Sequence, residues 1–190
     1  MSKELSERTL QELWTLFPIS LAQPNHEWAH WFSEERLALC EILSGIPFDS
    51  IEHIGSTAIN GILAKNIVDI LITFSQGTEL ERIAKRLTDQ AYLVMSSESK
   101  RISLNKGYTI NGFAERVFHL HLRFEGDDDE VYFRDYLNRH PSVAAEYEQL
   151  KVELCASYKN DRDAYTEAKG EFISKWTKVA KRVAGVADPL

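Results

Sequence analysis

Apolar residues recur at helical spacing at both ends of the chain and alternate with polar residues in its middle. A helix repeats every 3.6 residues or so and a strand every two, so the spacing distinguishes the two. Helical spacing predicts helices over residues 4–17 and 25–44. It predicts three more after an acidic turn, over residues 129–139, 141–159 and 161–183.

The middle of the chain reads as strands with one helix among them. The predicted strands cover residues 50–54, 66–74, 91–96, 101–104, 108–110 and 116–125. The last is the clearest, because Phe118, Leu120 and Leu122 alternate with His119 and His121. The segment TELE at 78–81 resembles a capping box, which predicts the start of the intervening helix.

This order of elements predicts an α+β fold built around a mixed sheet. We expect one domain over residues 1–190, with N-terminal helices in 1–45, a sheet core in 46–125 and C-terminal helices in 129–185. The apolar content of 44% is enough for one ordinary core.

The charge balance makes the chain acidic, with 22 Lys and Arg against 29 Asp and Glu and a net charge of −7. General binding to nucleic acid is therefore not expected, and any phosphate binding must be local. Cys40 and Cys155 form neither a disulfide framework nor a CxxC metal motif. The first residues lack a signal-peptide pattern and no long apolar run is present, so we expect a cytoplasmic protein without a membrane span.

The strand at 66–74 contains one acid where burial is expected. Ile70 and Ile72 share one face of this strand, while Asp69 and Leu71 share the other. A buried carboxylate is costly unless donors or a cation meet it. Asp69 could accept backbone N–H bonds or pair with a base, as a structural residue. Alternatively, it could face a cleft and hold a metal ion or a substrate.

A Gly-Ser pair before this strand favours the functional alternative. Gly55 permits a tight turn, and the hydroxyls and amides of Ser56 and Thr57 could hold an anion at a helix start. Residues 57–68 separate Ser56 from Asp69. The order strand, Gly-Ser, short helix, strand with an acid resembles the nucleotidyltransferase superfamily. There, Gly-Ser positions nucleotide phosphate and acids on the next strand hold divalent metal.

A closer resemblance covers roughly residues 25–175. The motif EHIGST at 52–57, with Gly61, Lys65 and Asp69, resembles the signature of the GrpB family, also called UPF0157. Further matching segments are HEWAHWFSEER, FHLHL at 118–122, FRDYLNRHP at 133–141, YEQLK at 147–151 and DRDAYTEAKGEFI at 161–173. The resemblance implies a nucleotidyltransferase-like α+β fold, without fixing a reaction. It implies that Gly55, Ser56 and Thr57 bind substrate and that Asp69 is catalytic and binds metal.

The chain departs from this superfamily at the second acid. Active nucleotidyltransferases usually carry it two positions after the first, and Leu71 stands there. Two carboxylates normally help to hold Mg²⁺. His119 and His121 point to one face of their strand, and with Asp69 they could ligate a divalent ion such as Mg²⁺, Mn²⁺ or Zn²⁺. Alternatively, they could be polar residues that line a cleft.

Several other polar residues are candidates for ligand contact. Lys65 and Arg123 could contact phosphate, as could Arg101. His53 could contact a ligand or brace the Gly-Ser turn by a hydrogen bond. Arg134 and Asp135 are expected to form a structural ion pair, and Tyr165 and Lys169 could border the cleft or pack their helix. The four tryptophans, Trp14, Trp28, Trp31 and Trp176, are expected in the core.

Two functions from different classes follow. The first is a metal-dependent nucleotidyltransferase with an unknown acceptor, in which Lys65 or Arg123 neutralises charge on the phosphates. The second is a non-catalytic module that kept the fold and binds a nucleotide or another small anion. Leu71 favours the second, and the intact Gly-Ser and Asp69 favour the first. We expect weak or no transfer with Mg²⁺. The oligomeric state does not follow from the sequence.

Overall fold

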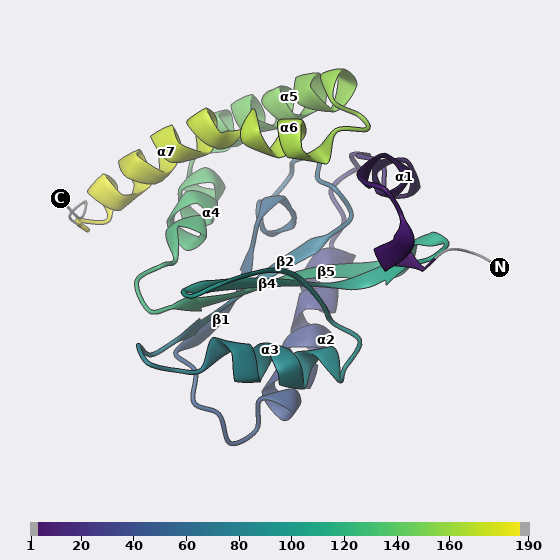
Figure 1. Cartoon of the computed structure of the whole chain (residues 1–190). Coiled ribbons are helices and arrows are strands. Elements are labelled where there is room, and N and C mark those ends of the chain that lie inside the picture. Colours follow the sequence, from purple (N-terminus) through teal and green to yellow (C-terminus); the bar gives the residue numbers. More distant parts are fainter. Residues whose placement is uncertain (1–3, 187–190) are drawn as a thin grey trace.

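The computed structural model describes residues 4–186. Within that range the chain forms an α+β fold with a five-stranded mixed sheet between two groups of helices (Figure 1). The strands are β1 (Ser50–Ile54), β2 (Val68–Phe74), β3 (Leu93–Glu98), β4 (Arg101–Thr109) and β5 (Gly112–Phe124). The α-helices are α1 (Leu10–Leu16), α2 (Glu27–Ile42), α3 (Leu80–Thr88), α4 (Asp129–Arg139), α5 (Pro141–Ser157), α6 (Arg162–Glu167) and α7 (Gly170–Val183). Two 3₁₀ turns, η1 (Leu5–Glu7) and η2 (Ser56–Ala58), complete the set.

The sheet order β1-β2-β5-β4-β3 places the strand with the acid beside the strand with the histidines. β2 and β5 are parallel, and Asp69 is the register partner of His119. The other neighbouring pairs are antiparallel, and Ile54 at the end of β1 is opposite Asp69. The mixed sheet that the sequence predicted is confirmed, and its register brings the Gly-Ser turn, Asp69 and His119 to one place.

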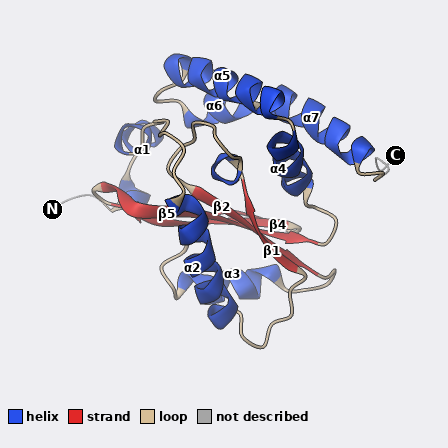
Figure 2. Ribbon diagram, turned by 180° about the vertical axis from the view of Figure 1, so that it is seen from behind, coloured by secondary structure: helices blue, strands red, loops and turns tan. Residues whose placement is uncertain are grey.

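The two faces of the sheet differ in chemistry. Ile70 and Ile72 of β2 and Leu120 and Leu122 of β5 are fully buried and pack in one cluster with residues of α2 and α3. Each such side chain contributes about 1.5–3 kcal/mol through burial. Both views place α2 and α3 on this side of the sheet and α1 with α4 to α7 on the other (Figures 1 and 2). The polar face that carries Asp69 therefore faces the C-terminal helices.

The C-terminal helices form a second, smaller core against the loop that follows the Gly-Ser turn. Its buried members are Ile59, Ile62, Phe133, Leu137, Val143, Ala144 and Tyr147. Arg134 of α4 ties this layer to β1, because it donates to Glu52 at 2.9 Å and to the carbonyl of His53 at 2.7 Å. Arg134 also bonds Asp135 at 2.7 Å, as the predicted structural pair requires.

Several local predictions differ from the structure, and the helix predicted over residues 4–17 is the 3₁₀ turn η1 followed by α1. The predicted strands at 101–104 and 108–110 are one strand, β4, with a register shift between Lys106 and Tyr108. The helix at 161–183 is two helices, because the chain breaks before Gly170, a residue that weakens helix interiors. The capping box at 78–81 is absent: Glu79 is the N-cap and makes no side-chain capping bond. No helix in residues 4–186 is long and apolar enough to cross a membrane.

Candidate functional site

The Gly-Ser turn is shaped by close contact with Asp69. Gly55 has φ of +71°, a conformation that favours glycine. A Cβ on this residue would lie 2.2 Å from Oδ2 of Asp69, a distance that no side chain tolerates. Glycine therefore lets the turn pass over the carboxylate and places Ser56 next to it. The predicted strand-to-helix turn is present, but η2 has only three residues, too few for a helix N-terminus to attract an anion.

His53 and Thr57 brace this turn. The Thr57 hydroxyl donates to the carbonyl of Ile67 at 3.1 Å, and it accepts from Nε2 of His53 at 2.9 Å. The His53 ring stacks on Phe32 with centroids 5.0 Å apart. Burial lowers the pKa of His53 to about 4, so the ring is neutral near pH 7. Neither residue lines the cleft described below, and both hold the Gly-Ser turn in place, which is the bracing alternative for His53.

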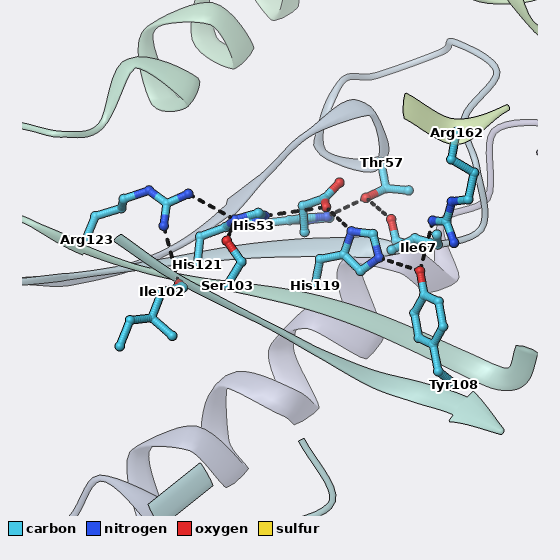
Figure 3. Close-up of polar contacts among 11 residues, drawn as sticks. His53, Thr57, Ile67, Ile102, Ser103, Tyr108, His119, His121, Arg123 and Arg162 are labelled. Atoms are coloured by element: carbon cyan, nitrogen blue, oxygen red, sulfur yellow. Dashed lines mark hydrogen bonds and ion pairs between the residues drawn. The ribbon is translucent and has the colours of Figure 1, made fainter. Parts of the chain in front are cut away.

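Arg162, Tyr108 and His119 form a chain of hydrogen bonds (Figure 3), and His119 connects this chain to Asp69. Arg162 donates to the Tyr108 hydroxyl at 2.9 Å, and this hydroxyl lies 2.8 Å from Nε2 of His119. Nδ1 of His119 is 3.1 Å from Oδ1 of Asp69. Since an ionised carboxylate only accepts, Nδ1 carries the ring proton and Nε2 accepts from Tyr108. Both ring nitrogens of His119 are thus engaged.

The pKa shifts of His119 and Asp69 agree with this arrangement of hydrogen bonds. Burial lowers the pKa of His119, which keeps the ring neutral. Burial alone raises the pKa of Asp69, but hydrogen bonds from His119 and His121 outweigh it and hold the pKa well below its usual range. Asp69 is therefore an anion across the physiological range. The sequence prediction that Asp69, His119 and His121 share one face is confirmed, and all three line the cleft.

Arg123 lies behind this cluster and outside the cleft. It is 6% exposed and donates to the carbonyls of Ile102 at 3.3 Å and Leu122 at 3.0 Å. Its second terminal nitrogen lies 3.3 Å from Nδ1 of His121. Because arginine only donates, Nδ1 of His121 accepts, and Nε2 turns toward Asp69 at 3.8 Å. Arg123 does not line the cleft, and its contact with His121 orients that ring. Arg101 pairs with Asp127 on the surface.

The three predicted metal ligands do not fit a divalent ion as they are arranged. His119 has no free ring nitrogen, and Leu71, at the usual position of a second acid, is fully buried. Across residues 4–186, no group of three or more His, Cys, Asp or Glu side chains is placed to hold a metal ion. Asp69 instead accepts a hydrogen bond from His119, and Nε2 of His121 lies 3.8 Å from the same carboxylate.

Four basic side chains converge on the same cleft from separate elements. Lys65 precedes β2, Lys151 lies on α5, Arg162 begins α6 and Lys169 precedes α7. The ammonium groups of Lys65 and Lys169 lie 5.4 and 4.5 Å from the centre of the Tyr165 ring. In the part of the chain that the structure describes, none of the four forms an ion pair with a carboxylate. Cation–π contact is favourable but leaves an ammonium group able to donate to a ligand.

Burial makes these ammonium groups less basic than ordinary lysines. Burial and the nearby charge of Lys169 lower the pKa of Lys151 to about 7. Burial, Lys169 and Arg162 lower the pKa of Lys65 to about 8, and burial also lowers that of Lys169. Lys151 is 1% exposed and donates to the carbonyl of Leu63. The charges repel one another, and the nearby negative charges of Asp69 and Glu148 offset this repulsion only in part.

The cleft has a volume of about 810 Å³ and lies between the polar face of the sheet and the helices α1, α5, α6 and α7. Ser56 and Tyr147 line this cleft together with Asp69. Trp14 of α1 also lines it, so the prediction of a core role is wrong for this tryptophan. Trp28 and Trp31 do belong to the core, and Trp176 packs on Tyr136 and Phe172.

Comparison with known proteins identifies the family. Residues 18–179 match the family model described as GrpB protein. The chain belongs to the GrpB family. The glutamate-rich protein GrpB of Alkalihalophilus pseudofirmus is 32% identical over 163 residues, which is 83% of this chain and 92% of that protein. The UPF0157 protein YqkA of Bacillus subtilis is 30% identical over 161 residues, and the chain spans 46% of its length.

Solved structures show the same fold. The conserved protein GrpB from Enterococcus faecalis superposes with a TM-score of 0.74 at 27% identity, over 87% of this chain and 99% of that one. The Cid1 poly(U) polymerase with MgGTP bound superposes with a TM-score of 0.50 at 15% identity, over 84% of this chain and 52% of that one. This GrpB-family chain therefore has a nucleotidyltransferase-like fold, as the sequence predicted.

Proposed function

We propose that the cleft of this GrpB-family protein binds a small ligand with several phosphate groups, of the nucleotide class. The observation that carries the proposal is the convergence of Lys65, Lys151, Arg162 and Lys169 on one cleft without a carboxylate partner in the described chain. The carboxylates that line the same cleft are those of Asp69, Glu130 and Asp163, and none of them forms an ion pair with these four side chains in the described chain. In an acidic protein of net charge −7, four basic side chains gathered in one cleft without ion pairs are placed to bind an anion.

The size and fold of the site favour a nucleotide among phosphate-bearing anions. A volume of about 810 Å³ is within the usual range of small-molecule and cofactor sites. Ser56 stands beside Asp69 and the basic side chains, where its hydroxyl can donate to a phosphate oxygen. The Cid1 structure that shares the fold was solved with MgGTP, which supports nucleotides as the first ligands to test.

A second candidate function is metal-dependent nucleotidyl transfer. The position of Asp69 beside the Gly55 turn favours it, because a carboxylate at that place is suited to a cation near a bound phosphate. The burial of Leu71 and the engaged nitrogens of His119 count against it. We therefore expect nucleotide binding with weak or no Mg²⁺-dependent transfer.

Binding of ATP measured by calorimetry in EDTA tests the proposal. We expect Lys169→Met to weaken binding about tenfold or more, because a charge-assisted hydrogen bond is lost. Lys100→Met makes the same change in charge at an exposed turn outside the cleft and should leave the affinity unchanged. Equal affinities in wild type, Lys169→Met and Lys100→Met would refute the assigned site.

Substitution of Asp69 distinguishes nucleotide binding from metal-dependent nucleotidyl transfer. If the cleft binds phosphate directly, Asp69→Asn removes a like charge and ATP binds more tightly in EDTA. If Asp69 holds a metal ion, Asp69→Asn instead weakens ATP binding when Mg²⁺ is present. Nucleotide-consumption assays with Mg²⁺, Mn²⁺ and Zn²⁺ on wild type, Asp69→Ala and Ser56→Ala complete the test. Robust turnover that is lost in Asp69→Ala would establish the transferase.

A further inference from the structure

Helix α1 presents an open apolar face to the cleft. Leu10, Leu13 and Trp14 all line the cleft, and no residue of α1 is buried. Leu10 is 55% exposed. A seven-residue helix is too short to be stable alone, so its place depends on contacts at its ends. A contiguous apolar surface that lines a cleft is a typical feature of a ligand-binding groove.

The end of α1 is firmly anchored beside the charged part of the cleft. Phe17, which follows the helix, is 3% exposed and packs on Tyr108 with ring centroids 4.7 Å apart. Arg8, which lies before the start of α1, donates to the carbonyl of Ile110 at 3.0 Å. The Tyr108 hydroxyl in turn bonds Arg162. The apolar side chains of α1, Tyr108 and the basic side chains therefore line one continuous cleft.

We propose that α1 forms the wall against which the aromatic base of a nucleotide lies, with Trp14 as the main contact. This inference rests on the proposed function, which places the phosphates on the lysines. A ligand that satisfies both walls needs an anionic group at one end and a flat apolar body at the other. Stacking on an aromatic side chain accepts any base, so Trp14 supplies affinity for the base without selecting among bases.

The position of α1 in the sequence shows whether this apolar wall belongs to the part of the chain that the family model matches. The family model matches residues 18–179, so α1 precedes the matched part, whereas Ser56 and the four basic residues lie within it. The phosphate end of the cleft thus belongs to the family pattern. The wall for the base is contributed by a segment outside that pattern, which is where differences in ligand between relatives would arise.

A comparison of ATP with tripolyphosphate tests the inference, because the two probes share phosphates and differ in the nucleoside. We expect wild type to bind ATP about tenfold more tightly than tripolyphosphate in EDTA. Trp14→Ala should remove this preference and leave the affinity for tripolyphosphate unchanged, while Trp14→Phe should keep most of the preference. Thermal melts of each variant check that the fold is intact.

Tryptophan fluorescence gives an independent readout. ATP should quench emission in wild type and in the control Trp176→Phe, since Trp176 lies outside the cleft. In Trp14→Phe the quenching should disappear while calorimetry still detects binding. An unchanged preference in Trp14→Ala would overturn the inference and leave the phosphate site standing. Tighter binding of a long-chain alkyl phosphate than of ATP would also overturn it. If neither ATP nor tripolyphosphate binds, the proposed function itself fails.

Discussion

Asp69 and Gly55 pack directly against each other, and the geometry of the site depends on this contact. The carboxylate fills the volume that a side chain at position 55 would need, so the Gly-Ser turn and the acid are one packing arrangement. His119 donates to the same carboxylate from the neighbouring strand. The acid is therefore held by a backbone turn and an imidazole, and its position does not depend on a metal ion.

Substitution of Gly55 tests this packing. Gly55→Ala introduces a Cβ 2.2 Å from Oδ2 of Asp69 and also strains the backbone. Gly61→Ala is a matched control, because Gly61 has φ of +76° but no atom within 4 Å of the added Cβ. We expect a loss of unfolding free energy of about 1–2 kcal/mol for Gly61→Ala and at least about 3 kcal/mol for Gly55→Ala. Equal losses in urea titrations would show that contact with Asp69 is unimportant.

At the scale of elements, the link between α4 and β1 keeps the C-terminal helices over the polar face of the sheet. The Arg134 side chain is 16% exposed and bonds Glu52, Asp135 and the carbonyl of His53. That carbonyl belongs to the strand that leads into the Gly-Ser turn. The helices that supply Lys151 and Lys169 are thus joined, through α4, to the strand that positions Ser56.

Removal of this link should cost more than removal of an exposed ion pair. We expect Arg134→Ala to lower the unfolding free energy by about 1.5–3 kcal/mol, because several charge-assisted bonds are lost from a mostly buried side chain. Arg101 pairs with Asp127 through two hydrogen bonds, but its side chain is 55% exposed. Arg101→Ala should therefore cost only about 0.2–1 kcal/mol. A similar cost for both substitutions in denaturant titrations would contradict the link.

The alternation of side chains predicted the sheet face of the site, because a strand's period of two relates every side chain to its neighbours. It placed His119 and His121 with Asp69, and the register confirms this. It predicted β4 as two pieces, at 101–104 and 108–110, whereas the structure has one strand. Gly107 lies within this strand with φ of +90°. A Cβ added at this position would lie 2.3 Å from the carbonyl oxygen of Arg116, so only glycine fits there.

The basic wall could not be predicted in the same way, because its members come from different elements. Lys151 and Arg162 lie more than 80 residues from Asp69, and only packing of the C-terminal helices brings them to it. Lys151 does fall within the family segment YEQLK, a signal that could have pointed to it. Periodicity shows which face of a helix is apolar and does not show what that face meets.

At the scale of the whole molecule, burial of the lysines predicts a stability that increases with pH. Their pKa values are about 7 for Lys151 and about 8 for Lys65, against about 10.4 in an unfolded chain. Between about pH 7 and 10 the unfolded chain binds more protons, so the unfolding free energy from these groups rises with pH. Urea titrations from pH 6.5 to 9 should show the rise, and it should be smaller in Lys151→Met.

Ligand affinity should change with pH in the opposite direction. A bound phosphate favours the ammonium form, so binding takes up protons wherever the free lysines are partly neutral. ATP is fully ionised above about pH 7.5, so a change in affinity above that pH reports on the protein. We expect the affinity for ATP to fall between pH 7.5 and 9, by up to about tenfold per pH unit for each lysine that loses its proton. Calorimetry in two buffers of different ionisation enthalpy measures the uptake directly. A constant affinity without proton uptake would show that the phosphates do not lie against Lys65 and Lys151.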